Sequence, residues 1–210
     1  MTPKQPDMNP SGSQPSTTGR SGERIRIVDD EGRPALMVDG AILSIALVGA
    51  DPPSGYWAAM LPEGSPRSAL LLGLGGGTLA HLLSGRYPGI EMVGIDADQE
   101  VIDFALRGFG LQMPNLEVVV GDAFDYVARC RRSFDFVAVD LFVGYSFQHG
   151  ALARPFLRQL KSIAGSGGEI AFNLFKDKRT EQRLARIGRV LRVHRLDRAG
   201  RNLVAHCKGS

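Results

Sequence analysis

The stretch that decides the fold is ALLLGLGGGTLAHLL, residues 69–83, in which four glycines fall within five positions between two apolar runs. The first run predicts a buried strand and the second a helix, so the glycines form the turn between them. At the carboxyl end of a parallel strand, a turn without side chains lets a ligand lie across the backbone, and the next helix offers free N–H groups. The stretch therefore predicts a strand–turn–helix unit that binds a ligand.

The spacing of these glycines narrows the choice of ligand. Gly73, Gly75 and Gly77 form the pattern G-x-G-x-G, with Gly76 as an additional glycine. A dinucleotide-binding turn has G-x-G-x-x-G, but the sixth position here is Thr78. The spacing favours S-adenosylmethionine over NAD, and a tight turn without a ligand is the alternative.

From Ser68 onward, strand and helix patterns alternate five times, and a hairpin around the RAGRN turn follows. Such alternation indicates an α/β fold with helices on both faces of a parallel sheet. Five units and a hairpin make a doubly wound, seven-stranded, mostly parallel sheet, the Rossmann-like layout of class I S-adenosylmethionine-dependent methyltransferases. The predicted strands are 69–74, 90–96, 116–121, 134–140 and 169–175, the predicted helices 77–86, 98–109, 122–131, 154–165 and 179–191, and the hairpin 191–209.

The N-terminal third of the chain has a different composition and a different pattern of apolar residues. Residues 1–22 are rich in Pro, Ser, Thr and Gly, and we expect a disordered tail there. Residues 23–50 alternate apolar and polar positions around short turns, which predicts a short antiparallel β meander. Residues 51–210 then form the transferase domain, with a helical turn around residues 56–61.

Composition sets limits on the class of protein. The chain has 210 residues, of which 43% are hydrophobic and 22% charged, as in one globular domain. No apolar run approaches the roughly 20 residues that cross a bilayer, and no apolar leader follows Lys4, so we expect a cytoplasmic protein without membrane contact. Cys130 and Cys207 are interpreted as buried thiols, and the four histidines are scattered without the spacing of a metal site.

The C-terminal end is basic, because residues 176–210 contain eleven Lys or Arg against three acids. Aromatic residues that could stack on bases are missing there, which argues against nucleic acid as a partner. Leu184, Ile187 and Leu191 recur at helical spacing, whereas Arg183, Arg186, Arg189 and Arg192 step around the helix. A solvated outer face is the favoured interpretation, with RNA as a minor alternative.

Three aspartates lie at or just after the tips of predicted strands. Asp96 ends the second strand, where its carboxylate could accept hydrogen bonds from both ribose hydroxyls of a nucleoside. Asp98 is interpreted as the N-cap of the next helix. Asp122 ends the third strand, where it could accept from an adenine amino group or cap the following helix.

These residues resemble the spermidine synthase family, including its divergent members, over most of residues 24–175. The matching pieces are YWAAM (56–60), LLLGLGGGTLAHLL (70–83), GIDADQEVI (94–102), NLEVVVGDAFDYV (115–127) and FDFVAVDLF (134–142). The resemblance implies S-adenosylmethionine or its decarboxylated form as the cofactor. It implies cofactor contacts from the loop 73–77, from Asp96 with Ala97, from Asp122 with Ala123, and from Asp140.

The departures from the family concern the acceptor. Authentic members have a second Asp where this chain has Val143, an Asp where it has Gly76, and an acid after the tyrosine where it has Ala58 or Ala59. Asp140 and Tyr56 remain, and we expect them to be the catalytic residues. The loop after Asp140 is apolar and aromatic, which suits a neutral or aromatic acceptor better than a diammonium chain.

We therefore expect methyl transfer to a small-molecule acceptor, with Asp140 as base or orienting acceptor. The first alternative is a polyamine aminopropyltransferase that uses decarboxylated S-adenosylmethionine. A nucleoside-binding module without enzymatic activity and an RNA methyltransferase are further alternatives. The sequence leaves the acceptor and the oligomeric state, for example a homodimer, open.

Overall fold

The computed structural model describes residues 24–47 and 55–209. An antiparallel meander comes first, made of β1 (Ile25–Asp30), β2 (Arg33–Val38) and β3 (Ala41–Ile45). Leu36 and Val38, which alternate along β2, are buried on one side of the meander, and Ala35 and Ile45 are buried as well. The meander is thus confirmed, whereas the tail 1–22 and the boundary between residues 50 and 51 lie outside the described residues.

The main sheet has seven strands in the order β11-β12-β10-β7-β4-β5-β6. Within this sheet β4, β5, β6, β7 and β10 are parallel, and β12 pairs antiparallel with both β10 and β11. This confirms the predicted doubly wound sheet with a closing hairpin. The strands are β4 (Ser68–Leu72), β5 (Glu91–Asp96), β6 (Leu116–Val120), β7 (Phe136–Val139), β10 (Glu169–Phe175), β11 (Arg192–Ala199) and β12 (Asn202–Lys208).

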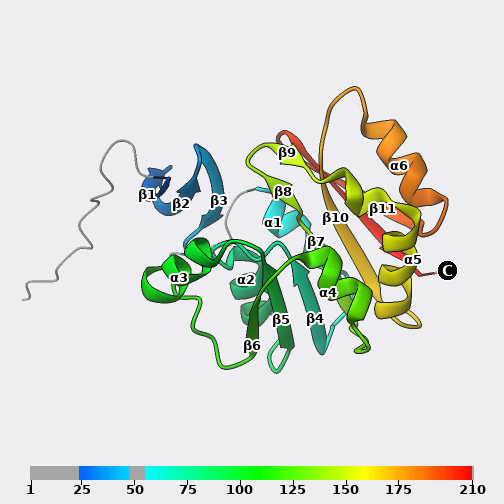
Figure 1. Ribbon diagram of the computed structural model, residues 1–210, viewed down its shortest axis with the longest axis horizontal. Coiled ribbons are helices and arrows are strands. Elements are labelled where there is room, and N and C mark those ends of the chain that lie inside the picture. The colour runs from blue at the N-terminus through cyan, green and yellow to red at the C-terminus, as the bar shows by residue number, and fades with distance from the viewer. Residues whose placement is uncertain (1–23, 48–54, 210) are drawn as a thin grey trace, which may run out of the picture.

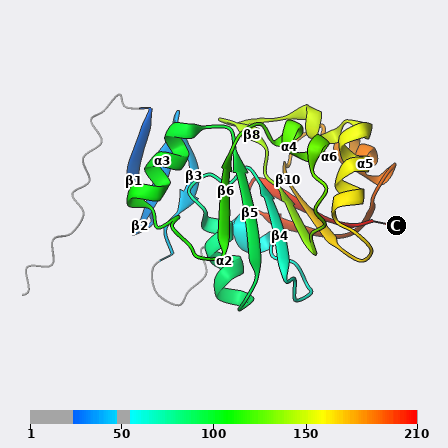
Figure 2. The same ribbon diagram turned by 60° about the horizontal axis from the view of Figure 1, so that its bottom comes forward.

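Helices cover both faces of the sheet (Figures 1 and 2). Alternate strand residues point to opposite faces, so Leu71 joins a core with the meander and α1 to α3, while Leu72 joins a core with α4 to α6. None of the described helices is long and apolar enough to cross a membrane. The helices are α1 (Tyr56–Ala59), α2 (Thr78–Arg86), α3 (Gln99–Gly108), α4 (Ala123–Arg129), α5 (Arg154–Ile163) and α6 (Thr180–Gly188).

The segment after β7 contains structure that the sequence analysis treated as a loop. A small hairpin, β8 (Phe142–Val143) with β9 (Ser146–Phe147), is followed by the 3-10 helix η1 (His149–Leu152). The Tyr145 hydroxyl at the tip of this hairpin donates to the Gly40 carbonyl of the meander, at 2.9 Å. The hairpin therefore reaches from the sheet to the meander.

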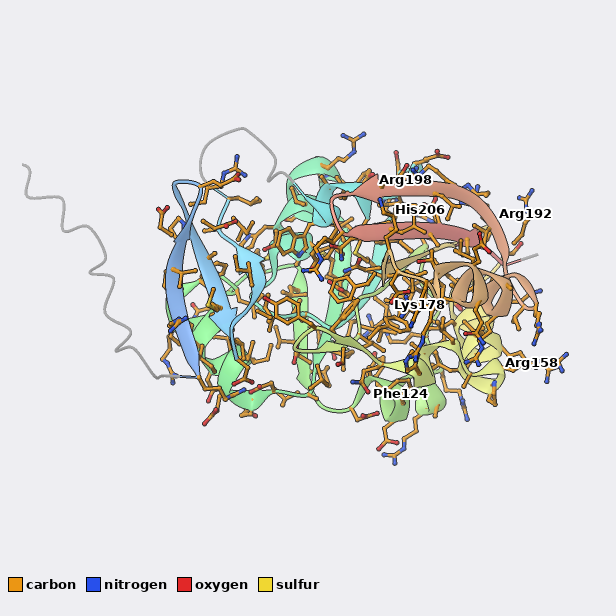
Figure 3. The ribbon with its side chains drawn as sticks, turned by 90° about the horizontal axis from the view of Figure 1, so that it is seen from above. Phe124, Arg158, Lys178, Arg192, Arg198 and His206 are labelled. Atoms are coloured by element: carbon orange, nitrogen blue, oxygen red, sulfur yellow. The ribbon has the colours of Figure 1, made fainter. Side chains whose placement is uncertain are left out.

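Two interpretations of individual side chains need correction. Arg183 is not on a solvated face: it is buried and bonds the Asp177 carboxylate at 2.9 Å with each of two nitrogens. Cys130 is partly exposed, whereas Cys207 is buried as expected. Other cations at this end do project outward from different elements, as Figure 3 shows for Arg158, Arg192 and Arg198.

Candidate functional site

A cavity of about 890 Å³ lies at the carboxyl ends of the parallel strands. It spans the point between β4 and β7 where the strand order reverses, which is where open α/β sheets bind ligands. We divide its wall into two halves. The β5/β6 half contains Gly75, Asp96, Ala97, Asp98, Asp122 and Ala123, and the β7/β12 half contains Asp140, Phe142, Val143, Asn173, Phe175, Arg201 and Asn202.

The glycine loop follows β4, the strand between β5 and β7, and its glycines are needed mainly for packing. At Gly73 (φ +88°) an added Cβ would lie 2.1 Å from the Asp140 carbonyl oxygen, so the two backbones are in direct contact. Gly73 and Gly75 line the cavity, but Gly76 and Gly77 do not. Their N–H groups already donate to the Ser44 hydroxyl and to the Leu74 carbonyl. The bare turn thus packs against the protein itself, and Gly73 and Gly75 leave it without side chains at the cavity wall.

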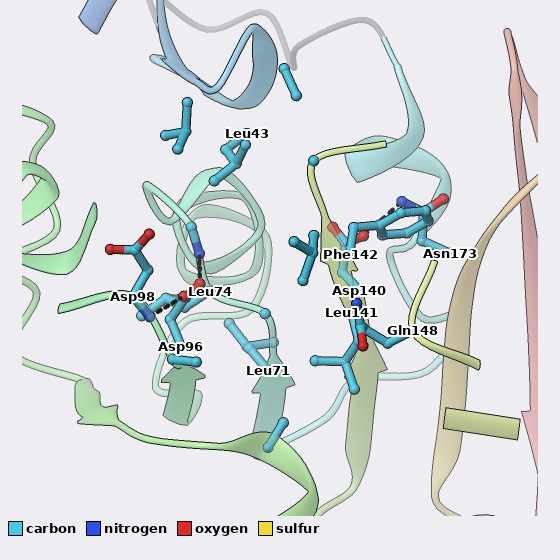
Figure 4. Close-up of a pocket in the computed structure, with 18 of the residues that line it drawn as sticks. Leu43, Leu71, Leu74, Asp96, Asp98, Asp140, Leu141, Phe142, Gln148 and Asn173 are labelled. Atoms are coloured by element: carbon cyan, nitrogen blue, oxygen red, sulfur yellow. Dashed lines mark hydrogen bonds between the residues drawn. The ribbon is translucent and has the colours of Figure 1, made fainter. Parts of the chain in front are cut away.

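Asp96 is held at the end of β5 by the loop beside it. Its carboxylate accepts from Gly75 N at 2.8 Å and from Asp98 N at 3.0 Å, as Figure 4 shows. Burial raises the pKa of Asp96, while these backbone hydrogen bonds lower it. A carboxylate has about four acceptor sites, so Asp96 keeps capacity for further donors in the cavity. Its assignment to a ribose stays a prediction.

The other two strand-tip aspartates are helix caps. Asp98 accepts from Glu100 N and Val101 N at the start of α3, which confirms its predicted role. It also pairs with both Arg24 guanidinium nitrogens, at 2.6 and 3.0 Å. Asp122 caps α4 through one oxygen, which accepts from two backbone N–H groups. Because Asp122 and Ala123 also line the cavity, the adenine position stays open to them.

Asp140 is the centre of a buried polar network in the β7/β12 half. Its carboxylate accepts from Asn173 Nδ2 at 2.7 Å and from the Tyr56 hydroxyl. Asn173 Oδ1 in turn accepts from Asn202 Nδ2 at 2.8 Å. Burial raises the pKa of Asp140 to about 6, against the opposing effect of its hydrogen bonds. The structure therefore brings Asp140 and Tyr56 together, as the sequence analysis expected.

This network has no cation in it, and no ion pair of Asp140 occurs in residues 24–47 and 55–209. A buried carboxylate with a pKa near neutrality can accept a proton from a ligand and return it to solvent. The Tyr56 hydroxyl is itself a poor acid here, because burial and the Asp140 charge raise its pKa. Tyr56 therefore serves here as a hydrogen-bond donor to the Asp140 carboxylate, and a catalytic role of either residue stays a prediction.

The surroundings of Asp140 are aromatic. The Phe142 ring lies 4.8 Å from the Phe175 ring and 5.4 Å from the Phe147 ring, measured between centroids. Val143, at the place of the family's second acid, is 69% exposed and lines the cavity. The apolar character predicted for this loop is thus present at the wall of the cavity.

The sequence analysis missed three residues of this half. Asn173 could have been found, because a lone amide in the apolar strand EIAFNLF signals a buried hydrogen-bond partner. Arg201 and Asn202 lie in the RAGRN turn, where a polar residue is the ordinary choice and gives no signal. They reach the site only because β12 pairs with β10 and places Asn202 opposite Phe175.

Comparisons with known proteins agree with this architecture. Residues 35–181 match the model of the spermine/spermidine synthase domain. A polyamine aminopropyltransferase of Vibrio vulnificus is 32% identical over 56% of this chain and 41% of its own length. An eEF1A lysine and N-terminal methyltransferase homolog of Drosophila melanogaster is 31% identical over 51% of this chain and 18% of its own length. The chain thus spans less than half of either relative.

Among solved structures, a probable spermidine synthase from Corynebacterium glutamicum superposes with a TM-score of 0.74. The superposition covers 88% of this chain and 76% of the other, at 17% identity, and it shows a shared fold. Most of the named curated relatives are aminopropyltransferases, and methyltransferase homologs are the others. The names therefore favour the aminopropyl alternative of the sequence analysis over its expectation of methyl transfer.

Proposed function

The chain belongs to the spermine/spermidine synthase domain family, and from this premise we propose that it is a transferase. Its cofactor is S-adenosylmethionine or the decarboxylated form, and its acceptor is a small molecule. The observation that carries the proposal is one cavity with a hydrogen-bond acceptor at each end. Asp96 stands beside the glycine loop at one end and Asp140 at the other, as Figure 4 shows.

The cavity fits such a cofactor in size and in chemistry. Its volume of about 890 Å³ lies in the upper part of the roughly 300–1,000 Å³ range of ligand pockets, which leaves room for a nucleoside and an acceptor. Asp96 offers charged acceptor sites for the two ribose hydroxyls. Gly73 and Gly75 present a wall without side chains next to it.

The division of labour follows from the two halves. When bound, the cofactor supplies an alkyl carbon attached to a positively charged sulfur, which leaves with the electron pair of the broken bond. Asp140, oriented by Tyr56 and Asn173, accepts the proton that the acceptor atom loses as it forms the new bond. Phe142 and Phe175 exclude water from the reacting atoms.

The group transferred has two candidates. Aminopropyl transfer is supported by the names of most curated relatives and by the retained Asp140 with Tyr56. Methyl transfer is supported by the lost acids. At Gly76 an added Cβ would lie 2.8 Å from Ser44 Cβ and 2.9 Å from the Phe109 ring, so no acid fits there. At the cavity wall, Val143 replaces the second acid, and the single carboxylate of Asp140 offsets only part of the cost of desolvating a diammonium acceptor.

The experiment that tests the function measures both cofactors against the same protein. Calorimetry with each cofactor is followed by incubation with a metabolite mixture, and mass spectrometry records a gain of a methyl or an aminopropyl group. Asp96→Asn should weaken binding of the preferred cofactor at least about tenfold, the scale of a lost hydrogen bond to a charged group. Asp125→Asn, on the exposed side of α4, is the matched control and should leave the affinity unchanged.

Each outcome decides one part of the proposal. Failure of both cofactors to bind would overturn it altogether. Binding without any modified acceptor would support a nucleoside-binding module instead. Transfer of an aminopropyl group to putrescine would establish the family's namesake reaction, and transfer from S-adenosylmethionine alone would establish methyl transfer.

A further inference from the structure

Charge is distributed unevenly around the cavity wall. The β5/β6 half and the adjoining meander contribute most of its acids and one cation, Arg24, which is neutralised by Asp98 and Glu100. The β7/β12 half contributes a single acid, Asp140, and a single cation, Arg201. An acceptor bound in this half therefore meets a positive charge that the sequence analysis did not anticipate.

The backbone of Arg201 is held by the end of β10, and its side chain is exposed to solvent at the wall of the cavity. Its carbonyl accepts from Lys176 N at 2.8 Å, and its neighbour Asn202 stands opposite Phe175 in the sheet. The guanidinium carbon lies 5.9 Å from the centre of the Phe175 ring. An arginine over an aromatic face is oriented by the ring and keeps its N–H groups free for an anion.

The charge of Arg201 is not used inside the protein. In the ranges 24–47 and 55–209, no carboxylate forms an ion pair with it. Apart from the Asp140 carboxylate, this half consists of the Phe142 and Phe175 rings, two asparagine amides and the exposed Val143. A diammonium acceptor would thus find one carboxylate and one repelling cation, while an acceptor with a negative end would find a partner for it.

We infer that the acceptor carries an anionic group, a carboxylate or a phosphate, which Arg201 binds while the nucleophilic atom lies at Asp140. The apolar body of the acceptor packs against Phe142 and Phe175. This inference rests on the proposed function for the identity of the site as an acceptor site. The binding of an anion at Arg201 can be measured without it.

The test uses simple aromatic probes and the full chain. Calorimetry measures benzoate, phenyl phosphate, benzylamine and putrescine, each without and with S-adenosylhomocysteine. Arg201→Gln should weaken binding of the preferred anion at least about tenfold, because a charge-assisted contact is lost. Arg198→Gln, on the same hairpin but outside the cavity wall, is the matched control and should bind the anion as the unmodified chain does. Arg201→Glu should reverse the preference toward benzylamine.

Benzoate binding better than phenyl phosphate identifies a carboxylate site, and the opposite order identifies a phosphate site. Putrescine binding more tightly than both anions to the unmodified chain would overturn the inference, and so would equal anion affinities of Arg201→Gln and the unmodified chain. Failure of S-adenosylhomocysteine to bind counts against the proposed function alone, because the anion measurements without it still decide the role of Arg201.

Discussion

Two buried polar networks lie at opposite ends of the same pair of strands, β10 and β12, and they are built in opposite ways. At the cavity end, Asn173 and Asn202 lead to Asp140. At the other end, His206 Nδ1 donates to Glu169 at 2.6 Å, and His206 Nε2 lies 2.8 Å from the Ala59 carbonyl oxygen. The first network lines the cavity at the strand ends, and Glu169 and His206 lie outside the wall of that cavity.

The networks also differ in how their charges are balanced. The network around Glu169 includes a cation, because Arg195 lies 2.7 Å from His206. Arg195 is itself paired with the Glu63 carboxylate at 2.9 Å. Burial raises the pKa of Glu169, but the hydrogen bond and charge of His206, together with the charges of Arg195 and His194, bring it below its ordinary value. At Asp140 only neutral donors oppose burial, and the pKa rises to about 6. A matched network holds the fold, whereas an unmatched carboxylate at a cavity is available for chemistry.

The largest effect is expected for the network around Asp140. Asp140→Asn should lower the rate of the native transfer about 100-fold or more, the scale of a lost general base. Cofactor affinity should change less than about threefold, because the base acts on the transition state. Single-turnover rates and calorimetry on the same preparation check this. Equal losses of rate and cofactor affinity would make Asp140 a binding group.

Substitutions in the network around Glu169 should change the stability of the protein instead of its reaction rate. Glu169→Ala leaves the buried His206 without its carboxylate partner and should lower the free energy of unfolding by about 1–3 kcal/mol, measured by urea denaturation at pH 7. Glu117→Ala breaks the exposed pair with Arg132 and should change it by less than about 1 kcal/mol. Because the pKa of Glu169 is lowered in the folded state, its contribution is present above the ordinary value of 4.5. The deficit of the variant should shrink as the pH falls below that value.

The pH dependence of the transfer rate should depend on Asp140 and not on Glu169. With a pKa of about 6, Asp140 is ionised and able to accept a proton at pH 7, and it is protonated in acid. The value of kcat/KM should be constant above pH 7 and fall about tenfold per pH unit well below pH 6. Glu169→Ala should show the same profile in its folded range. A profile that is flat from pH 5 to 8 would exclude Asp140 as the base.

The smallest effect is expected at the cavity rim. Arg24→Ala breaks the ion pairs with Asp98 and Glu100, which are partly exposed to solvent. The free energy of unfolding should fall by less than about 1 kcal/mol, since exposed pairs contribute little. Arg24→Ala should also leave benzoate affinity unchanged, in contrast to Arg201→Gln. A loss above 2 kcal/mol in thermal or urea unfolding would show that this pair anchors the meander.

The sheet was predictable because its central strands are continuous apolar runs. Such runs are typical of parallel strands that are buried on both faces of a sheet. The predicted strand 169–175 coincides with β10, and the other parallel strands begin or end within a few residues of their predictions. The hairpin β8–β9 escaped because strands of two residues carry no period.

The candidate site was predictable only where a residue ends a strand. Asp96 and Asp140 follow apolar runs directly, so parallel strands place them at one edge. No such rule tells which way a loop residue faces. The sequence therefore could not show that Gly76 and Gly77 lie outside the cavity wall. The pairing of Glu169 with His206 depends on strand order, although a charged residue in an apolar strand signals that a partner exists.

The contact of Gly73 with the Asp140 carbonyl oxygen has a thermodynamic consequence. Asp140 N also donates to the Leu72 carbonyl at 2.8 Å, so the loop beside one ligand and the carboxylate beside the other form one backbone unit. If the proposed cofactor or acceptor shifts that backbone unit on binding, the site of the other ligand shifts with it. Linkage then requires the factor by which the acceptor changes cofactor affinity to equal the factor by which the cofactor changes acceptor affinity. Under the proposed function, one coupling free energy thus describes both the binding of the cofactor and the binding of the acceptor.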